Sequence, residues 1–292
     1  MTAVHHRRPA GAPAWSAADI GRAATLALHD ELALAPKPGL VSFADNGSHD
    51  DMDAHSFMRS LFALRRYFVR IAELGAARAP FGALERCGQE AEARMLAATG
   101  GVNTHRGAIF MLGLLCAAAG AAATDPATGC GPTAATVRAA LLRHWGDALQ
   151  ARCARMPTLP GGLAARRHGL RSASQEAALG FPIVFAVALP AWMRARQAGL
   201  GSTRLRLQVF FEIMAVLDDA NLAHRGGTAG LQHARQQARR FLRAGGAAQP
   251  AGLVQAQAQA IHADFVERRL SPGGCADSLS AACFLHRLGV VL

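Results

Sequence analysis

Apolar residues recur every three or four positions along most of the chain, which is the spacing of one face of an α-helix. Residues 53–71 show this clearly, because an aspartate that can cap a helix precedes five apolar side chains on one face: Phe57, Leu61, Leu64, Phe68 and Ile71. No segment shows a convincing alternation of apolar and polar residues, as a strand would. The pattern therefore predicts an all-α protein.

Capping and helix-breaking residues set the expected limits of the helices. Ser16 followed by Asp19 forms a capping box, and the prolines within residues 177–193 should kink an apolar helix there. Residues 156–174, rich in proline and glycine, are predicted to form a flexible loop. The expected helices cover residues 16–34, 53–71, 81–98, 107–124, 133–155, 177–193, 203–217, 231–244, 253–269 and 271–288.

These elements predict one domain, since no clean linker divides the chain. We expect residues 15–292 to form a single all-α catalytic domain of roughly ten helices. Residues 1–14 are expected to be a disordered leader, because they carry basic residues without the apolar core of a secretory signal.

The formal net charge of +11 predicts that the protein binds an anionic partner. The basic residues are dispersed and aromatic residues do not alternate with arginine, so we do not expect nucleic acid. Nor do we expect a membrane, because the glycine and alanine content of residues 107–124 suits a close-packed buried helix. The six cysteines form no C-x-x-C pair and predict reduced packing residues in a cytoplasmic protein.

Polar side chains concentrate in four segments between the expected helices, residues 36–53, 99–107, 218–227 and 271–277. Three of the four are glycine-rich beside a helix start, where unpaired N–H groups favour a bound phosphate. Thr104 is expected to cap the helix that follows it.

Scarce residue types also fall in these segments. Lys37 is the only lysine, and Asn46, Asn103 and Asn221 are the only asparagines. The sequence N-x-H-R-G that starts at Asn103 resembles the N-x-x-H-R-G that starts at Asn221. An old duplication or two arms of one site would explain the similarity.

Carboxylates gather in the same segments, and beside a polyphosphate such a group usually indicates Mg²⁺. They are Asp45, Asp50, Asp51, Asp218, Asp219 and Asp277. Helix capping is the alternative, and it plausibly accounts for Asp53 and Asp277. The chain has no G-x-x-x-x-G-K-[ST] loop, no G-x-G-x-x-G and no G-x-S-x-G.

Taken together, six motifs resemble the triphosphoribosyl-dephospho-CoA synthase family, in the order in which that family carries them. They span residues 36–277 and read P-K-P-G-L-V, G-S-H-D-D-M-D, G-G-V-N-T-H-R-G-A-I-F, E-A-A-L-G-F-P, D-x-N-x-x-H-R-G-G and S-P-G-G-x-A-D. Two positions depart from the family, which usually has serine in place of Cys275 and threonine in place of Ala220. A hydroxyl contact to phosphate or metal-bound water would be lost at either position.

The resemblance implies an all-helical fold and a glycosyl transfer, with Mg²⁺ as the expected ion. The ribose 2′-hydroxyl of 3′-dephospho-CoA would replace adenine at C1 of the ATP ribose, and the triphosphate would stay on the product. That product is the prosthetic-group precursor for the acyl carrier of citrate lyase or malonate decarboxylase, and it would pass to an acyl-carrier-protein transferase. The sequence does not choose between the two pathways and leaves the oligomeric state open.

Residue roles follow from this chemistry as hypotheses, since bond cleavage gives an oxocarbenium-like transition state and a basic leaving group. Asp51 or Asp219 would be the base, and His49 or His105 the acid. The metal candidates are Asp51, Glu90 and Asp219. The expected substrate and phosphate ligands are Lys37, Ser48, Asn103, Thr104, Arg106, Asn221, Arg225, Gly226, Gly227, Ser271, Gly273 and Gly274.

Two other function classes fit the sequence less well. One is an all-α Mg²⁺-dependent nucleotide hydrolase, which would need no acceptor. The other is a helical adaptor for acidic partners, which would show no turnover.

Overall fold

The structure is a computed structural model that describes residues 15–125 and 132–290. These residues form 12 α-helices and no strand, which confirms the all-α fold. The expected leader, residues 1–14, lies outside the described residues. The α-helices are α1 (Ala17–Leu32), α2 (Ala54–Ala76), α3 (Phe81–Ala98), α4 (Arg106–Ala123), α5 (Ala134–Cys153), α6 (Pro160–Arg167), α7 (Ala173–Ala178), α8 (Leu189–Gln197), α9 (Ser202–Met214), α10 (Ala220–Arg243), α11 (Ala251–Glu267) and α12 (Gly273–Arg287).

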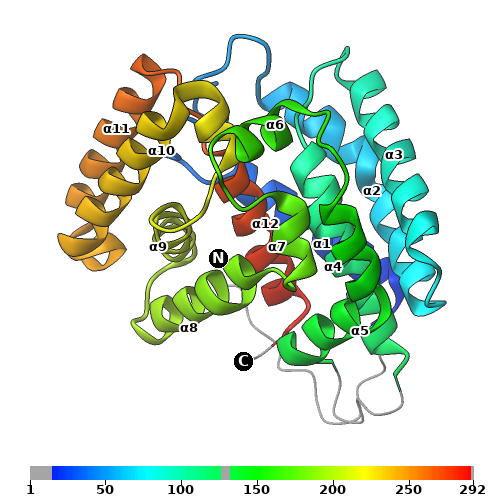
Figure 1. The fold of residues 1–292 in the computed structure, drawn as a ribbon. Helices are drawn as coiled ribbons and strands as arrows, with labels where there is room; N and C mark the ends of the chain where they lie inside the picture. Colours follow the sequence, from blue (N-terminus) through cyan, green and yellow to red (C-terminus); the bar gives the residue numbers. More distant parts are fainter. Residues whose placement is uncertain (1–14, 126–131, 291–292) are drawn as a thin grey trace.

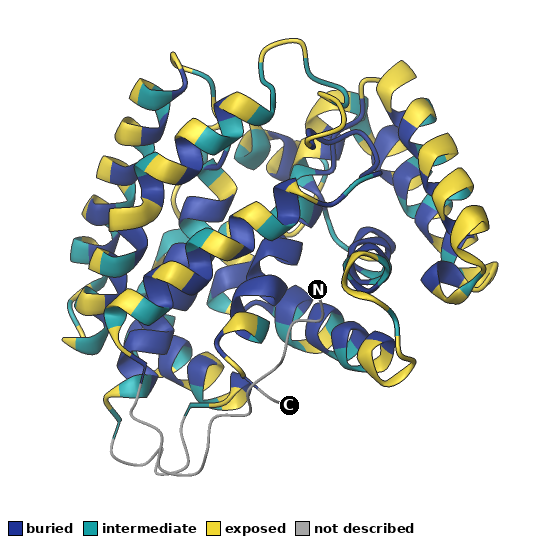
Figure 2. Ribbon diagram, turned by 180° about the vertical axis from the view of Figure 1, so that it is seen from behind, coloured by how far each residue is buried: buried dark blue, intermediate teal, exposed yellow. Residues whose placement is uncertain are grey.

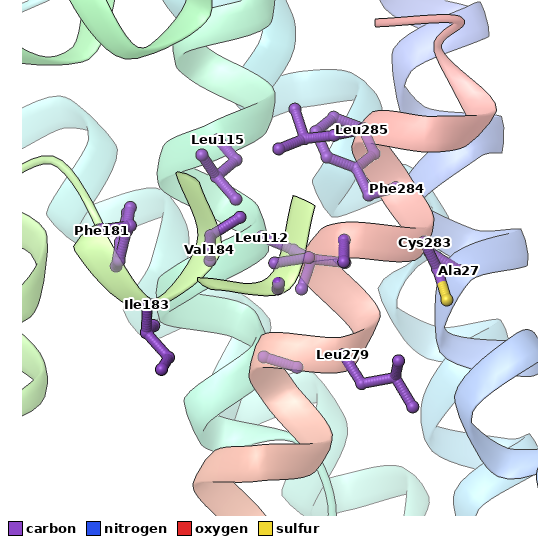
Figure 3. Close-up of a cluster of buried hydrophobic side chains, with 14 of the residues drawn as sticks. Ala27, Leu112, Leu115, Phe181, Ile183, Val184, Leu279, Cys283, Phe284 and Leu285 are labelled. Carbon is purple, nitrogen blue, oxygen red and sulfur yellow. The ribbon is translucent and has the colours of Figure 1, made fainter. Parts of the chain in front are cut away.

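Helices α4 and α12 lie at the centre of the molecule and are covered by the others. Helix α12 packs against α1, α4 and α9, and α4 packs against α2 and α5 (Figure 1). Buried residues line the surfaces where helices face one another, and exposed residues lie on the outer helix faces (Figure 2). Figure 3 shows part of the resulting core, with Leu112 and Leu115 of α4 beside Phe284 and Leu285 of α12.

Helix α4 is long and apolar enough to cross a membrane by length and composition alone, and 78% of it is buried inside the fold. Small residues let it approach α2 closely. A Cβ atom on Gly75 of α2 would lie 2.0 Å from the carbonyl oxygen of Ala117, and one on Gly120 of α4 would lie 2.2 Å from that of Ala72. The glycine and alanine content of this segment therefore serves backbone contact between two core helices.

Several predicted helix ends are confirmed. The Ser16 hydroxyl accepts from the Asp19 amide, and Asp19 Oδ2 accepts from the Ser16 amide, so the capping box is present. Asp53 caps α2 by accepting from the Ser56 amide at 2.8 Å. Helix α1 ends at Leu32, two residues before the predicted end at residue 34.

Two predictions about helix limits are wrong. The expected loop at residues 156–174 contains α6, which starts at Pro160, because proline suits the first position of a helix. Residues 218–227 were expected to form a loop, but most of them form the first turns of α10, which is kinked at Gly227 with φ of 62°.

The expected kinked helix at residues 177–193 is divided into three parts. Helix α7 ends at Ala178, and Phe181 follows with φ of 51°. A π-helical segment, Ile183–Ala188, then leads directly into α8. The buried Glu176 carboxylate accepts from the Ile183 amide at 2.6 Å and thereby holds the break in place.

Candidate active site

The loop that precedes α2 is fixed to the chain between α11 and α12. The Ser48 hydroxyl donates to the carbonyl oxygen of Leu270 at 2.6 Å and to that of Phe265 at 3.1 Å. Arg225 of α10 donates to the carbonyl oxygens of Ser48 at 3.0 Å and Arg269 at 3.2 Å. Direct hydrogen bonds therefore join two of the polar segments, residues 36–53 and 218–227, to residues 265–270, which precede the fourth segment.

His49 lies at this junction. Its Nε2 is 2.9 Å from Ser271 Oγ, and its Nδ1 is 3.1 Å from Arg225 Nη2. The Asp51 carboxylate is farther away, at 3.6 Å from Nδ1, and is 62% exposed. Burial lowers the pKa of His49, and the Arg225 guanidinium lowers it further. The imidazole is therefore a poor source of a proton near neutral pH.

Asp219 joins the start of α10 to the start of α12. Its Oδ1 accepts from the amides of Asn221 at 2.9 Å and Leu222 at 3.2 Å, and its Oδ2 accepts from that of Cys275 at 2.9 Å. Burial raises the pKa of Asp219, and these hydrogen bonds oppose the shift. Both carboxylate oxygens already serve as helix caps, which disfavours the predicted roles of base and metal ligand.

Gly273 and Gly274 bring the first turn of α12 close to α10. A Cβ atom on Gly273 would lie 2.4 Å from Asn221 Nδ2, and one on Gly274 would lie 3.1 Å from Asp219 Oδ2. Gly226 and Gly227 lie inside α10, where Gly226 faces Leu270. The two glycine pairs thus differ, because one opens a helix and the other sits at a kink.

Asp277 connects the start of α12 to the start of α4. A Cβ atom on Gly107 would lie 2.0 Å from Asp277 Oδ2, so only glycine leaves room for this carboxyl group. Burial, Glu31 and Asp219 raise the pKa of Asp277 well above its usual value, although the Ala108 amide opposes the shift. The sequence placed Asp277 among the clustered carboxylates, with helix capping as the alternative, and did not indicate its place between α4 and α12.

Lys37 lies behind this region and is 1% exposed. Its ammonium donates to the carbonyl oxygen of Glu31 at 2.8 Å and to the carboxylate of the same residue. Burial lowers the pKa of Lys37, and the Glu31 carboxylate opposes that shift. The predicted phosphate ligand is therefore a buried ion pair in this structure, and Glu31 is a partner that sequence analysis did not identify.

His105 precedes α4 and is 4% exposed. Its Nδ1 lies 2.6 Å from the Ser60 hydroxyl, and its Nε2 has no hydrogen-bond partner. Burial lowers the pKa of His105 to about 3, and the Lys37 charge adds to the shift. A neutral imidazole cannot deliver a proton as the predicted acid would, but its Nε2 can form a hydrogen bond.

The start of α4 differs from the prediction in its cap. Asn103 Oδ1 accepts from the Arg106 amide at 3.0 Å, whereas the Thr104 hydroxyl has no partner. His105 occupies the N-cap position without a side-chain cap hydrogen bond, and Asn103 supplies the acceptor for the first helical amide. The prediction that Thr104 caps this helix was therefore wrong. The Arg106 side chain donates to Glu92 Oε1 at 2.5 Å, so it is already paired with a carboxylate.

The predicted metal ligands do not form a metal cage. In the part of the chain that the structure describes, no group of three or more His, Cys, Asp or Glu side chains is arranged to hold a metal ion. Glu90 lies on the exposed face of α3, and Asp219 is committed to backbone amides. The Asp51 carboxylate is also largely exposed, at 62%.

Comparison with known proteins places the chain in a family. The model of the ATP:dephospho-CoA triphosphoribosyl transferase family matches residues 17–291. The chain belongs to this family. The resemblance drawn from the six motifs is therefore confirmed, together with the transferase class.

Curated relatives of the family cover most of the chain. A probable 2-(5''-triphosphoribosyl)-3'-dephosphocoenzyme-A synthase of Azotobacter vinelandii is 40% identical over 91% of this chain and 90% of its own length. Proteins of the same name from Pseudomonas fluorescens and Vibrio cholerae are 41% and 37% identical, over 90% and 92% of this chain and 88% of their own lengths. No solved structure matches the chain significantly.

Proposed function

We propose that the chain transfers the triphosphoribosyl group of ATP to the ribose 2′-hydroxyl of 3′-dephospho-CoA. The bond between C1′ and adenine breaks, and a bond between C1′ and the acceptor oxygen forms. The hydroxyl proton is lost and adenine gains one, so the reaction is balanced without an oxidant or reductant. Family membership over residues 17–291 is the observation that carries this proposal.

The arrangement of three helix starts supports it. The first turn of α12 contacts the cap of α10 through Cys275 and Asp219, and it contacts the first turn of α4 through Asp277 and Gly107. The amino-terminal end of a helix carries positive potential and favours phosphate groups. Three such ends in one region suit a triphosphate better than any single one would.

The surroundings of the carboxyl groups suggest which side chain donates a proton to adenine and which accepts one from the acceptor hydroxyl. The pKa of Asp277 is raised well above its usual value. Its carboxyl group is therefore suited to hold a proton and to donate it to departing adenine. Asp51 is the better of the two predicted bases, because Asp219 is fully engaged by three backbone amides. Neutral His105 offers a hydrogen bond to substrate from its unpartnered Nε2.

The residues of the candidate site fit the expected Mg²⁺ only as an ion that binds together with the substrate. A resident ion held by Asp51, Glu90 and Asp219 does not fit, because the described residues offer no three-ligand group. Mg²⁺ usually binds through one or two carboxylates plus substrate phosphates. We therefore propose that the ion enters with the triphosphate, where it neutralises charge.

The wider setting follows from the same family. We propose that the product is a prosthetic-group precursor, that an acyl-carrier-protein transferase receives it, and that the chain acts in the cytoplasm. The family description supports the identity of the two substrates, ATP and dephospho-CoA.

Adenine release tests the proposal. The purified chain is incubated with ATP and Mg²⁺, with and without dephospho-CoA, and adenine and phosphate are measured by chromatography. We expect adenine only when dephospho-CoA is present. Phosphate without adenine would favour the hydrolase, and the absence of any turnover would favour the adaptor.

A further inference from the structure

Ser271, His49 and Asp51 lie in the order of a nucleophile, a base and an orienting acid. Ser271 Oγ is 2.9 Å from His49 Nε2, and Asp51 Oδ1 is 3.6 Å from His49 Nδ1. In a hydrolytic triad the acid would hold the proton on Nδ1, and Nε2 would accept the serine proton. The structure contains a fourth group, Arg225, that changes this assignment.

Arg225 decides which nitrogen of His49 carries the proton. Its Nη2 lies 3.1 Å from Nδ1, which is hydrogen-bonding distance, whereas the Asp51 oxygen at 3.6 Å is too far. A guanidinium has donors and no acceptor, so Nδ1 has to accept. The proton is then on Nε2, and Nε2 donates to the Ser271 oxygen.

We infer that Arg225 fixes His49 as the Nε2–H tautomer, and that His49 thereby orients the Ser271 hydroxyl to donate to a phosphate oxygen of a nucleotide substrate. His49 and Arg225 are positioning residues in this arrangement, and Ser271 is neither a nucleophile nor a base. The inference rests on the proposed function for the identity of the ligand. It assigns a donor and an acceptor to each hydrogen bond among Arg225, His49 and Ser271.

The surroundings of Ser271 favour this use of its hydroxyl. One oxygen lone pair is occupied by His49, and no described residue accepts the remaining proton. Ser271 is 4% exposed, so bulk water has little access to it. It stands two residues before α12, whose first turn already faces the starts of α4 and α10. A phosphate group bound there would supply the missing acceptor.

The tautomer can be read directly from the wild-type chain. Histidine is labelled with ¹⁵N, and two-bond ¹H–¹⁵N spectra are recorded near neutral pH, with the His49 signals assigned from their loss in His49→Gln. We expect Nδ1 at the shift of an unprotonated nitrogen and Nε2 at that of a protonated one. The opposite pattern, or two protonated nitrogens, overturns the inference.

Arg225→Met tests the cause of the tautomer, and Arg269→Met is its matched control. Both remove one arginine charge near His49, but the Arg269 side chain lies 3.6 Å from Asp50 instead of contacting the imidazole. We expect Arg225→Met to introduce the second tautomer and Arg269→Met to leave the spectrum unchanged. Equal spectra for the two variants contradict a role for Arg225.

A pair of isosteric variants tests the direction of the hydrogen bond. The amide of His49→Gln can still donate to Ser271, whereas the carboxylate of His49→Glu can only accept. We expect His49→Gln to keep kcat/KM within about threefold and His49→Glu to lose roughly tenfold or more, the effect of one hydrogen bond to a charged ligand. A role in packing alone would affect both variants alike.

A double-mutant cycle links the two residues. If His49 acts through Ser271, His49→Ala should cost little once Ser271→Ala is present, and additive losses overturn the inference. A rise in the KM of ATP assigns the phosphate to the triphosphate, and a rise in the KM of dephospho-CoA assigns it to the pyrophosphate. If wild type forms no adenine at all, the proposed function fails, whereas the tautomer spectrum still decides the hydrogen-bond directions.

Discussion

Two titratable groups at the residue scale, the buried Lys37 and the half-buried Asp277, were marked by the sequence but not explained by it. Lys37 was singled out as the only lysine, and the structure adds that it is paired with Glu31 at the end of α1. Asp277 was recognised as a carboxylate near a helix start, and its contact with Gly107 depends on how α4 and α12 pack. Composition can identify an unusual residue, but its partner depends on tertiary contacts.

The Lys37–Glu31 pair should be needed for folding stability. Glu31→Gln leaves a buried ammonium without its counter-charge, and we expect the free energy of unfolding to fall by about 3–5 kcal/mol. Denaturant unfolding measures this loss. Glu73→Gln is the control, because it breaks the exposed Arg70–Glu73 pair, which should contribute less than about 1 kcal/mol. Equal losses in the two variants would mean that Lys37 is solvated.

Asp277 should make stability depend on pH. Its folded-state pKa is raised by burial, so its stabilising effect is complete below the unfolded value of about 3.9 and is lost as the pH rises through the folded value. The substitution Asp277→Asn introduces a neutral amide that mimics the protonated carboxyl, so the melting temperature of this variant should exceed that of wild type at pH 8. The difference should vanish near pH 4. A constant difference across this range would show that the carboxyl is ionised in the fold.

At the scale of elements, periodicity predicted most helices and the prolines predicted a kink within residues 177–193, but other irregularities were missed. The range 81–98 matches α3 at both ends, because its apolar spacing and Pro80 are local signals. The kink of α10 at Gly227 and the π-helical segment at Ile183–Ala188 were not predicted. The π-helical segment follows a break that the Glu176 carboxylate holds through the Ile183 amide, a side-chain contact that apolar spacing does not reveal.

The cap of α4 can be tested with two neighbouring residues. Asn103→Ala removes the oxygen that accepts from the Arg106 amide, and we expect a loss of about 1 kcal/mol in the free energy of unfolding. Thr104→Ala is the matched control, because the Thr104 hydroxyl makes no hydrogen bond. Thermal or denaturant unfolding compares the two. A larger loss in the threonine variant would restore the original prediction that Thr104 is the cap.

The close contact of α2 and α4 predicts opposite effects of two glycine substitutions. Gly75→Ala would place a Cβ atom 2.0 Å from the Ala117 carbonyl oxygen, and we expect it to destabilise the fold by about 1–3 kcal/mol. Gly146→Ala in α5 meets open space and should stabilise it by up to about 1 kcal/mol. Melting temperatures that move in the same direction would argue against backbone contact between α2 and α4.

At the scale of the whole molecule, the fold brings together motifs that are far apart in the sequence. Hydrogen bonds join Ser48 to Leu270, Arg225 to Ser48, and Asp219 to the amide of Cys275. The candidate site is therefore built from three distant segments. The order of the motifs indicated the family, and the family model confirms it. The assignment of roles needed the structure, because burial and hydrogen-bond partners separate Asp277 from Asp219 and neutral His105 from a proton donor.

The most direct test of the whole proposal is the identity of the product. Mass spectrometry of a reaction with ATP, Mg²⁺ and dephospho-CoA should show one new compound with the mass of dephospho-CoA plus ATP minus adenine. Adenine should appear in equal amount, and ³¹P spectra should show an intact triphosphate. Free triphosphoribose, ADP or inorganic phosphate in place of that compound would contradict transfer to dephospho-CoA.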